Sequence, residues 1–172
     1  MPDLEYLDCR KTLKTPNRSD VPMGINTMLM AVHTKLRFVN MSHNFLAEDG
    51  ARAFASFLEI SKTIKSLRMN SCGMEAKSCE MMAEAVAKNP DLKLTEIQAS
   101  NNKFGKEGFI FLKTFFDQMK SLETVHFSNC IDQGKDGLSE LIEALIKNRD
   151  TLRYVDISGN DWNKNKAAAE SV

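Results

Sequence analysis

Several features that define whole classes of protein are missing from this 172-residue sequence. No run reaches the roughly 18 apolar residues that a membrane-spanning helix needs, and the amino-terminal segment lacks the pattern of a secretory signal. Neither charge sign is in excess: 23 basic residues balance 23 acidic ones, so no overall field favours nucleic acid or an anionic membrane. We therefore expect a cytoplasmic protein whose partner is neither nucleic acid nor a membrane.

Cysteine and histidine are too sparse and scattered for a disulfide framework or a metal centre. The four cysteines form no C-x-x-C pair and are expected to be free thiols: Cys9, Cys72, Cys79 and Cys130. Two G-K-x-G tetrapeptides, at 105–108 and 134–137, lack the rest of a phosphate-binding loop. No nucleophile elbow or paired-carboxylate arrangement occurs either. We expect no metal, no cofactor and no substrate chemistry of the chain's own.

What the sequence does contain is an internal repeat. The pattern L-x-x-L-x-L-x-x-N/C occurs five times in register, with first positions at residues 36, 64, 94, 122 and 152. A degenerate sixth copy opens the chain at Leu4, Leu7 and Cys9. The ninth position alternates between two residue types: Asn44, Cys72, Asn102, Cys130 and Asn160. This side chain is expected to meet backbone groups of the neighbouring repeat.

Each repeat continues into the apolar spacing of an amphipathic helix, as in Phe54 followed by Phe57 and Leu58. A short strand and a single helix cannot bury their apolar faces alone, whereas stacked repeats can. We therefore expect adjacent parallel strands on a concave wall and helices on the convex one. The inward strand residues expected to be buried are Leu36, Val39, Met41, Leu67, Met69, Leu94, Ile97, Val125, Phe127, Leu152, Val155 and Ile157.

A repeat of 28 to 30 residues with a full helix and an alternating Asn/Cys resembles the ribonuclease-inhibitor class of leucine-rich repeats. The expected fold is thus an α/β leucine-rich-repeat solenoid of five to six repeats in one domain, residues 1–172. It divides into a degenerate repeat (1–35), four repeats (36–63, 64–93, 94–121 and 122–151) and a partial or capping repeat (152–172). Glu170 stands where other helices have an apolar residue, which favours either a polar cap or a truncated piece.

Within that class, several stretches are similar to the GTPase-activating proteins of the Ran GTPase. Residues 40–46, N-M-S-H-N-F-L, are similar to the family's N-L-S-D-N-x-F/L-G, and residues 67–74, L-R-M-N-S-C-G-M, to L-x-L-N-N-C-G-M. Residues 94–104, L-T-E-I-Q-A-S-N-N-K-F, align with L-x-x-x-x-x-G-R-N-R-L, and 122–126 match L-E-x-V-H. Asn101 replaces the first Arg of G-R-N-R, and the family usually has more repeats and an acidic tail.

The resemblance implies an activator of GTP hydrolysis by a Ran-like small GTPase, with a place in nucleocytoplasmic transport and signal transduction. In that family an Asn helps to orient the GTPase's own catalytic glutamine, and Asn102 matches this Asn. Such an activator works by positioning and is not an enzyme on its own. The alternative is a non-catalytic protein-binding scaffold, or a fragment of one. Either way we expect a monomer with a protein partner.

The expected partner-binding residues lie in three places. Because side chains alternate along a strand, the first is an outward column: Asn40, Arg68, Gln98, His126 and Asp156, beside Phe38, Ser66, Glu96, Thr124 and Tyr154. Such a mixed polar surface suits a folded protein partner, although it is also compatible with a solvated face. The second place is Asn101 and Lys103, which flank Asn102. The third is a basic loop, which in the resembled family meets the GTPase and is otherwise a solvated linker: Arg10, Lys11, Lys14 and Arg18.

Overall fold

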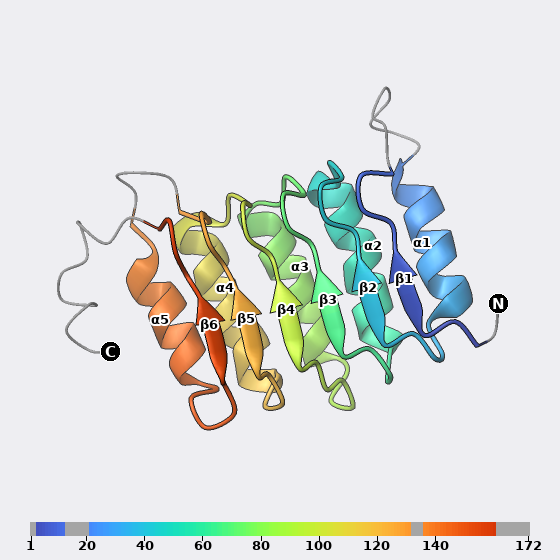
Figure 1. The fold of residues 1–172 in the computed structure, drawn as a ribbon. Helices are drawn as coiled ribbons and strands as arrows, with labels where there is room; N and C mark the ends of the chain where they lie inside the picture. Colours follow the sequence, from blue (N-terminus) through green and yellow to red (C-terminus); the bar gives the residue numbers. More distant parts are fainter. Residues whose placement is uncertain (1–2, 13–20, 132–135, 161–172) are drawn as a thin grey trace.

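The computed structural model describes residues 3–12, 21–131 and 136–160, in which strands and helices alternate (Figure 1). The strands are short and equal in length: β1 (Tyr6–Asp8), β2 (Phe38–Asn40), β3 (Ser66–Arg68), β4 (Glu96–Gln98), β5 (Thr124–His126) and β6 (Tyr154–Asp156). The helices follow them in turn: α1 (Val21–Val32), α2 (Ala47–Ile60), α3 (Ala76–Ala87), α4 (Gly105–Gln118) and α5 (Leu138–Ile146). This is the leucine-rich-repeat architecture that the repeat pattern predicts.

All six strands pair in parallel and in chain order, from β1 to β6. The register is the predicted one, since the middle residues of successive strands pair with each other: Leu7, Val39, Leu67, Ile97, Val125 and Val155. The degenerate first repeat therefore contributes a full strand. The five helices pack side by side on one face of the sheet and leave the opposite face, here called the open face, uncovered (Figure 1).

The core lies between the sheet and the helices, and most of the predicted core residues are buried there. Phenylalanines fill its carboxyl-terminal half, where the rings of Phe104, Phe109 and Phe127 meet edge to face with centroids 5.9 to 6.2 Å apart. The prediction is wrong for the last strand: Val155 is 41% exposed, and its two inward neighbours in the repeat are half-buried. In the part of the chain that is described, no helix follows β6 to cover it.

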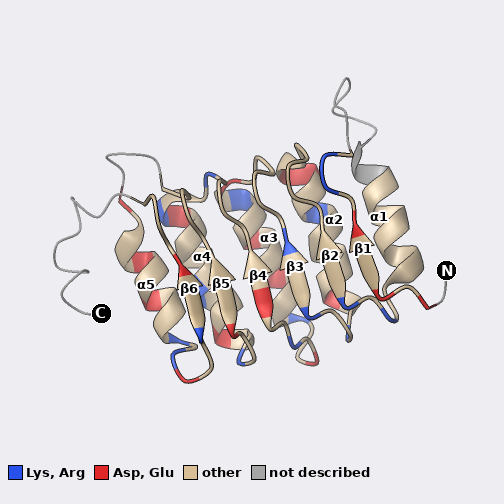
Figure 2. Ribbon diagram, in the orientation of Figure 1, with Lys and Arg blue, Asp and Glu red and all other residues tan. Residues whose placement is uncertain are grey.

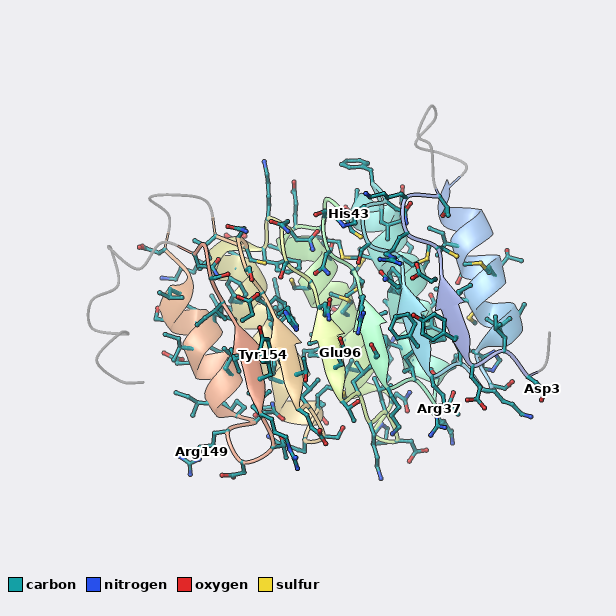
Figure 3. The ribbon with its side chains drawn as sticks, viewed as in Figure 1. Asp3, Arg37, His43, Glu96, Arg149 and Tyr154 are labelled. Atoms are coloured by element: carbon teal, nitrogen blue, oxygen red, sulfur yellow. The ribbon has the colours of Figure 1, made fainter. Side chains whose placement is uncertain are left out.

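The chain leaves each strand through a turn with left-handed backbone at the eighth repeat position. The residues and their φ angles are Lys11 (55°), His43 (61°), Ser71 (55°), Asn101 (58°), Asn129 (53°) and Gly159 (69°). This conformation aims the eighth side chain outward, as His43 shows at the upper edge in Figure 3, and turns the ninth one into the stack. We call this column of eighth positions the turn edge.

Candidate protein-binding face

Asn102 sits at the ninth repeat position and is only 2% exposed. Its side-chain oxygen accepts the backbone N–H groups of Cys72 and Met74, at 3.0 and 3.1 Å. Its side-chain nitrogen donates to the carbonyl oxygens of Met69 and Ala99, at 2.9 and 2.8 Å. An amide has two donor hydrogens and two acceptor lone pairs, so every hydrogen-bonding position of Asn102 is occupied within the repeat stack.

The same bonding rule holds along the chain, for cysteine as well as for asparagine. Each ninth side chain donates to the carbonyl at the sixth position of the preceding repeat: Asn44 to Cys9 (2.8 Å), Cys72 to Met41 (3.4 Å), Asn102 to Met69 (2.9 Å), Cys130 to Ala99 (3.4 Å) and Asn160 to Phe127 (2.8 Å). The expectation that these side chains meet the neighbouring repeat's backbone is confirmed. Together they form an internal ladder.

The ladder bears directly on the role that the sequence suggests for Asn102. Its amide has no hydrogen-bonding position left for a partner's glutamine unless these bonds open. That role stays a prediction, and the geometry weighs against it. Asn101 is the better placed of the two, because it lies exposed on the turn edge and its side-chain oxygen accepts a bond from the Asn129 amide at 3.1 Å. Lys103, one residue further, is also exposed.

A charged network centred on Glu96 occupies the middle of the open face (Figure 3). Arg68 forms an ion pair with Glu96 at 2.9 Å, while Ser66 and Gln98 donate to the same carboxylate at 2.7 and 2.5 Å. The Arg68 guanidinium also lies over the Phe38 ring, 4.9 Å from its centroid. Two predicted contact residues, Arg68 and Gln98, are thus held in place by a third side chain of the neighbouring column.

Aromatic side chains flank this network on both sides. The rings of Tyr6 and Phe38 stack with centroids 4.0 Å apart, and Tyr6 is 58% exposed. Towards the other end, Tyr154 is 53% exposed, and its ring lies 5.0 Å from that of His126. Tyr6 lies outside the repeat motif because its repeat is degenerate, although its alternation with the inward Leu7 is the signal that predicts a strand there.

The acidic end of the open face is Asp156, 3.6 Å from the Nδ1 atom of His126. The backbone N–H of Ser158 donates to its carboxylate at 3.0 Å. This bond stabilises the charged form and lowers the pKa of Asp156 from 3.8 to about 2. The carboxylate therefore stays ionised over the whole neutral range, so this end of the open face carries a fixed negative charge.

The remaining predicted contact residues do not form a single site. Asn40 is buried, and its side-chain oxygen accepts the Ser42 N–H at 3.1 Å, so it offers little surface to a partner. Arg10 and Lys11 are exposed next to β1, where Arg10 pairs with Asp8 at 2.9 Å. The other two members of the basic loop, Lys14 and Arg18, lie outside the described residues.

The thiols of the ladder stay protonated at neutral pH and are therefore poor nucleophiles. Burial raises the pKa of Cys72 and of Cys130 to about 12, and the buried Cys79 thiol is raised well above its usual value for the same reason. All four cysteines are free thiols. In the part of the chain that is described, no cluster of three potential metal ligands occurs, and none of the helices is long and apolar enough to cross a membrane.

Known proteins with leucine-rich repeats are similar in sequence to this chain. The ribonuclease inhibitor of Mus musculus is 32% identical over 127 residues, which are 73% of this chain and 27% of the inhibitor. The repeats of this chain are therefore similar to the leucine-rich repeats of the ribonuclease inhibitor. A second relative, the NACHT, LRR and PYD domains-containing protein 14 of Mus musculus, is 27% identical over 133 residues, 76% of this chain and 13% of its own length. The chain spans about a quarter of the inhibitor's length, and no family model matches it.

Solved structures confirm the leucine-rich-repeat fold over almost the whole chain. Leiomodin-1 actin-binding site 2 superposes with a TM-score of 0.66, covering 99% of this chain and 88% of its own, at 16% identity. The tropomodulin C-terminal domain of Caenorhabditis elegans superposes with a TM-score of 0.63, covering 86% of each chain, at 14% identity. At these identities the likeness concerns the fold alone.

Proposed function

We propose that this leucine-rich-repeat chain is a protein-binding arc and that it binds through the open face. One observation carries the proposal. The ladder side chains use their hydrogen-bonding groups inside the repeat stack, whereas the open face presents exposed aromatic residues on both sides of a charged network. Aromatic and arginine side chains dominate the energetics of protein interfaces. Tyr6, Arg68 and Tyr154 are the contacts that this reasoning selects.

Within this proposal, the partner is a small GTPase of the Ran type, and the chain accelerates GTP hydrolysis by that partner. Support comes from the motifs in residues 40–46, 67–74, 94–104 and 122–126 that resemble the Ran activators. The chain itself would contribute positioning and no chemistry on a substrate of its own. Since Asn102 is occupied in the ladder, we assign the contact near the partner's glutamine to the exposed Asn101 on the turn edge.

The decisive experiment separates binding from acceleration. Ran loaded with GTP is mixed with a substoichiometric amount of the chain, and hydrolysis is followed in a single turnover while binding is measured by calorimetry. An activator speeds hydrolysis and turns over, whereas a scaffold binds Ran without changing the hydrolysis rate. The absence of any binding would remove Ran as the partner.

Substitutions on the open face test the binding surface itself. Tyr154→Ala and Tyr6→Ala should each weaken partner binding by about tenfold, since exposed aromatic anchors are typical hot spots. Ile110→Ala is the matched control, because Ile110 is an exposed apolar residue on α4, on the helical side of the molecule. Equal losses in all three variants would contradict binding through the open face.

A further inference from the structure

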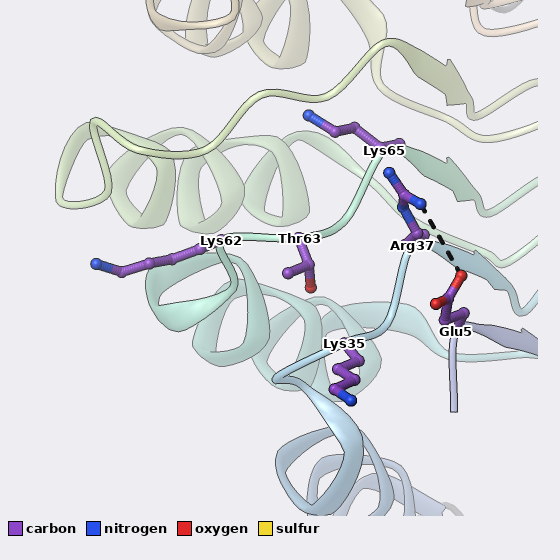
Figure 4. Close-up of a pocket in the computed structure, with 6 residues that line it drawn as sticks. All are labelled: Glu5, Lys35, Arg37, Lys62, Thr63 and Lys65. Carbon is purple, nitrogen blue, oxygen red and sulfur yellow. Dashed lines mark ion pairs between the residues drawn. The ribbon is translucent and has the colours of Figure 1, made fainter. Parts of the chain in front are cut away.

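A basic hollow lies at the edge where β2 and β3 begin, opposite the turn edge. Its volume is about 310 Å³, and its walls come from three successive repeats (Figure 4): Glu5, Lys35, Arg37, Lys62, Thr63 and Lys65. Four of these six side chains are cationic. Figure 2 shows the same concentration of lysine and arginine at the amino-terminal ends of β2 and β3. In a chain with no net charge, this is a local excess of one sign.

Stacking of the repeats creates this excess. Arg37 and Lys65 each immediately precede a strand residue at the same repeat position, and the Lys65 N–H donates to the Arg37 carbonyl at 2.8 Å. Neighbouring parallel strands lie about 4.8 Å apart, so the two side chains leave the edge side by side. Lys62 and Lys35 flank them from the loops that precede the strands.

Three cations of the hollow already hold carboxylates of the chain's own. Lys35 pairs with Asp3, Arg37 with Glu5 at 3.9 Å, and Lys62 with Asp91 at 2.9 Å. All three pairs are well exposed, and such pairs contribute little to stability because water and salt screen the two charges. The Arg37–Glu5 pair, drawn as a dashed line in Figure 4, is near the distance limit of an ion pair. A carboxylate from another molecule can replace them at little cost.

Two further cations form no direct ion pair within the part of the chain that is described, although Lys93 lies close enough to Asp91 to help lower its pKa. Lys65 donates only to the backbone carbonyl of Lys93 at 3.1 Å, and Lys93 forms no ion pair among the described residues. Five basic side chains thus face three acidic ones along this edge: Lys35, Arg37, Lys62, Lys65 and Lys93 against Asp3, Glu5 and Asp91. Positive charge remains available for a ligand.

We propose that the basic hollow binds an extended acidic segment, rich in Glu or Asp, of a partner protein. Carboxylates are the groups that these cations already bind, and an extended acidic segment can place several carboxylates against cations that come from neighbouring repeats. The interleaved Asp3, Glu5 and Asp91 disfavour a densely charged phosphate surface such as a nucleic acid or an anionic membrane. The site lies on the sheet edge, apart from the open-face network, and does not depend on the proposed function.

The test uses the full chain and a fluorescein-labelled oligoglutamate peptide, with binding followed by fluorescence anisotropy. The double variant Arg37→Gln/Lys65→Gln should weaken binding by about tenfold, equivalent to about 1.4 kcal/mol. Arg153→Gln is the matched control, because Arg153 holds the same repeat position before β6 and pairs with Glu123 at 4.0 Å. Its affinity should stay within about twofold of wild type, as expected for a remote surface charge.

Two further measurements complete the experiment. Binding should weaken as salt is added, because exposed charges are screened, and an oligoglutamine peptide of equal length should not bind. Thermal unfolding of each variant establishes that it is folded. Unchanged affinity in the double variant, or an equal loss in Arg153→Gln, would overturn the proposal. Tighter binding to phosphatidylserine vesicles than to the peptide would overturn the assignment of an acidic protein segment.

Discussion

Asn101 and Asn102 are adjacent in sequence, yet the side chain of Asn101 is exposed and that of Asn102 is buried. Asn101 takes a left-handed backbone conformation with φ 58° and leaves its amide at the surface of the turn edge. Asn102 is buried, with its amide bound to the backbone on both sides. A single turn therefore separates a residue available to a partner from one that joins two repeats.

Stability should distinguish these two positions. Asn102→Ala leaves the buried N–H groups of Cys72 and Met74 without their acceptor, and should lower the free energy of unfolding by about 1 to 3 kcal/mol. Asn101→Ala should lower it by at most about 1 kcal/mol, because alanine fits the left-handed backbone of this exposed turn less well than asparagine does. Urea unfolding followed by circular dichroism measures both. Asn44→Ala, at an equivalent ladder position, should resemble Asn102→Ala.

For GTPase stimulation we expect the opposite order, with the larger specific loss at Asn101. If the chain stimulates a Ran-type GTPase, Asn101→Ala should lower the stimulated rate by about tenfold, or about 1.4 kcal/mol in the barrier, while the protein remains folded. Asn102→Ala should lose activity only in proportion to its unfolded fraction. A fully folded Asn102→Ala protein without activity would show that this amide leaves the ladder and contacts the partner, as the sequence resemblance implies.

Because the last strand is exposed, a Val→Ala substitution should lower the free energy of unfolding by different amounts at two equivalent strand positions. Val125 and Val155 pair with each other in register, but Val125 is fully buried and Val155 is 41% exposed. Val125→Ala should lower the free energy of unfolding by about 1.5 to 3 kcal/mol, since it removes buried methyl groups and leaves a cavity. Val155→Ala should cost less than about 0.5 kcal/mol. Similar losses, measured by urea unfolding, would mean that β6 is covered in solution.

Asp156 should contribute a defined acid dependence. Its pKa is about 2 in the folded protein against 3.8 for an unperturbed carboxyl, so ionised Asp156 stabilises the folded state above about pH 4. That contribution is lost as the pH falls from about 4 to about 2, because the carboxylate then becomes protonated. Wild type should thus be more stable than Asp156→Asn at neutral pH, with the difference closing over this range. A difference that does not vary with pH would contradict the assignment.

The sequence predicted the strands, their parallel order and their register because the repeat fixes which residues face inward. One apolar residue every second position and a period of 28 or 30 residues leave few other ways to bury Val39, Leu67 and Ile97. The same pattern predicts that the ninth position forms a ladder, whereas the resemblance to the Ran activators implies a second role for Asn102. Only the structure shows that the four hydrogen bonds of the ladder occupy every donor and acceptor of the Asn102 amide.

Surface features were harder to predict because they depend on residues outside the repeat pattern. Arg37 and Lys65 lie 28 positions apart and become neighbours only through stacking. The hollow between them has no sequence signature, since its lining residues lie outside the repeat motif. Tyr6 lies outside the repeat motif because its repeat is degenerate. Val155 is exposed because no helix follows β6 among the described residues, a difference that the repeat pattern does not predict.

The left-handed conformation at the turn edge also introduces backbone strain in most repeats. A residue with a β-carbon is disfavoured in that conformation by roughly 1 kcal/mol, with asparagine less affected, and glycine escapes the penalty. Only Gly159 uses glycine there, while Lys11, His43, Ser71 and two asparagines keep their side chains. Glycine at His43 or Ser71 relieves this strain without touching the core, and the melting temperature rises where the relief exceeds the entropy that glycine adds to the unfolded chain. The turn edge is where thermostability can be engineered.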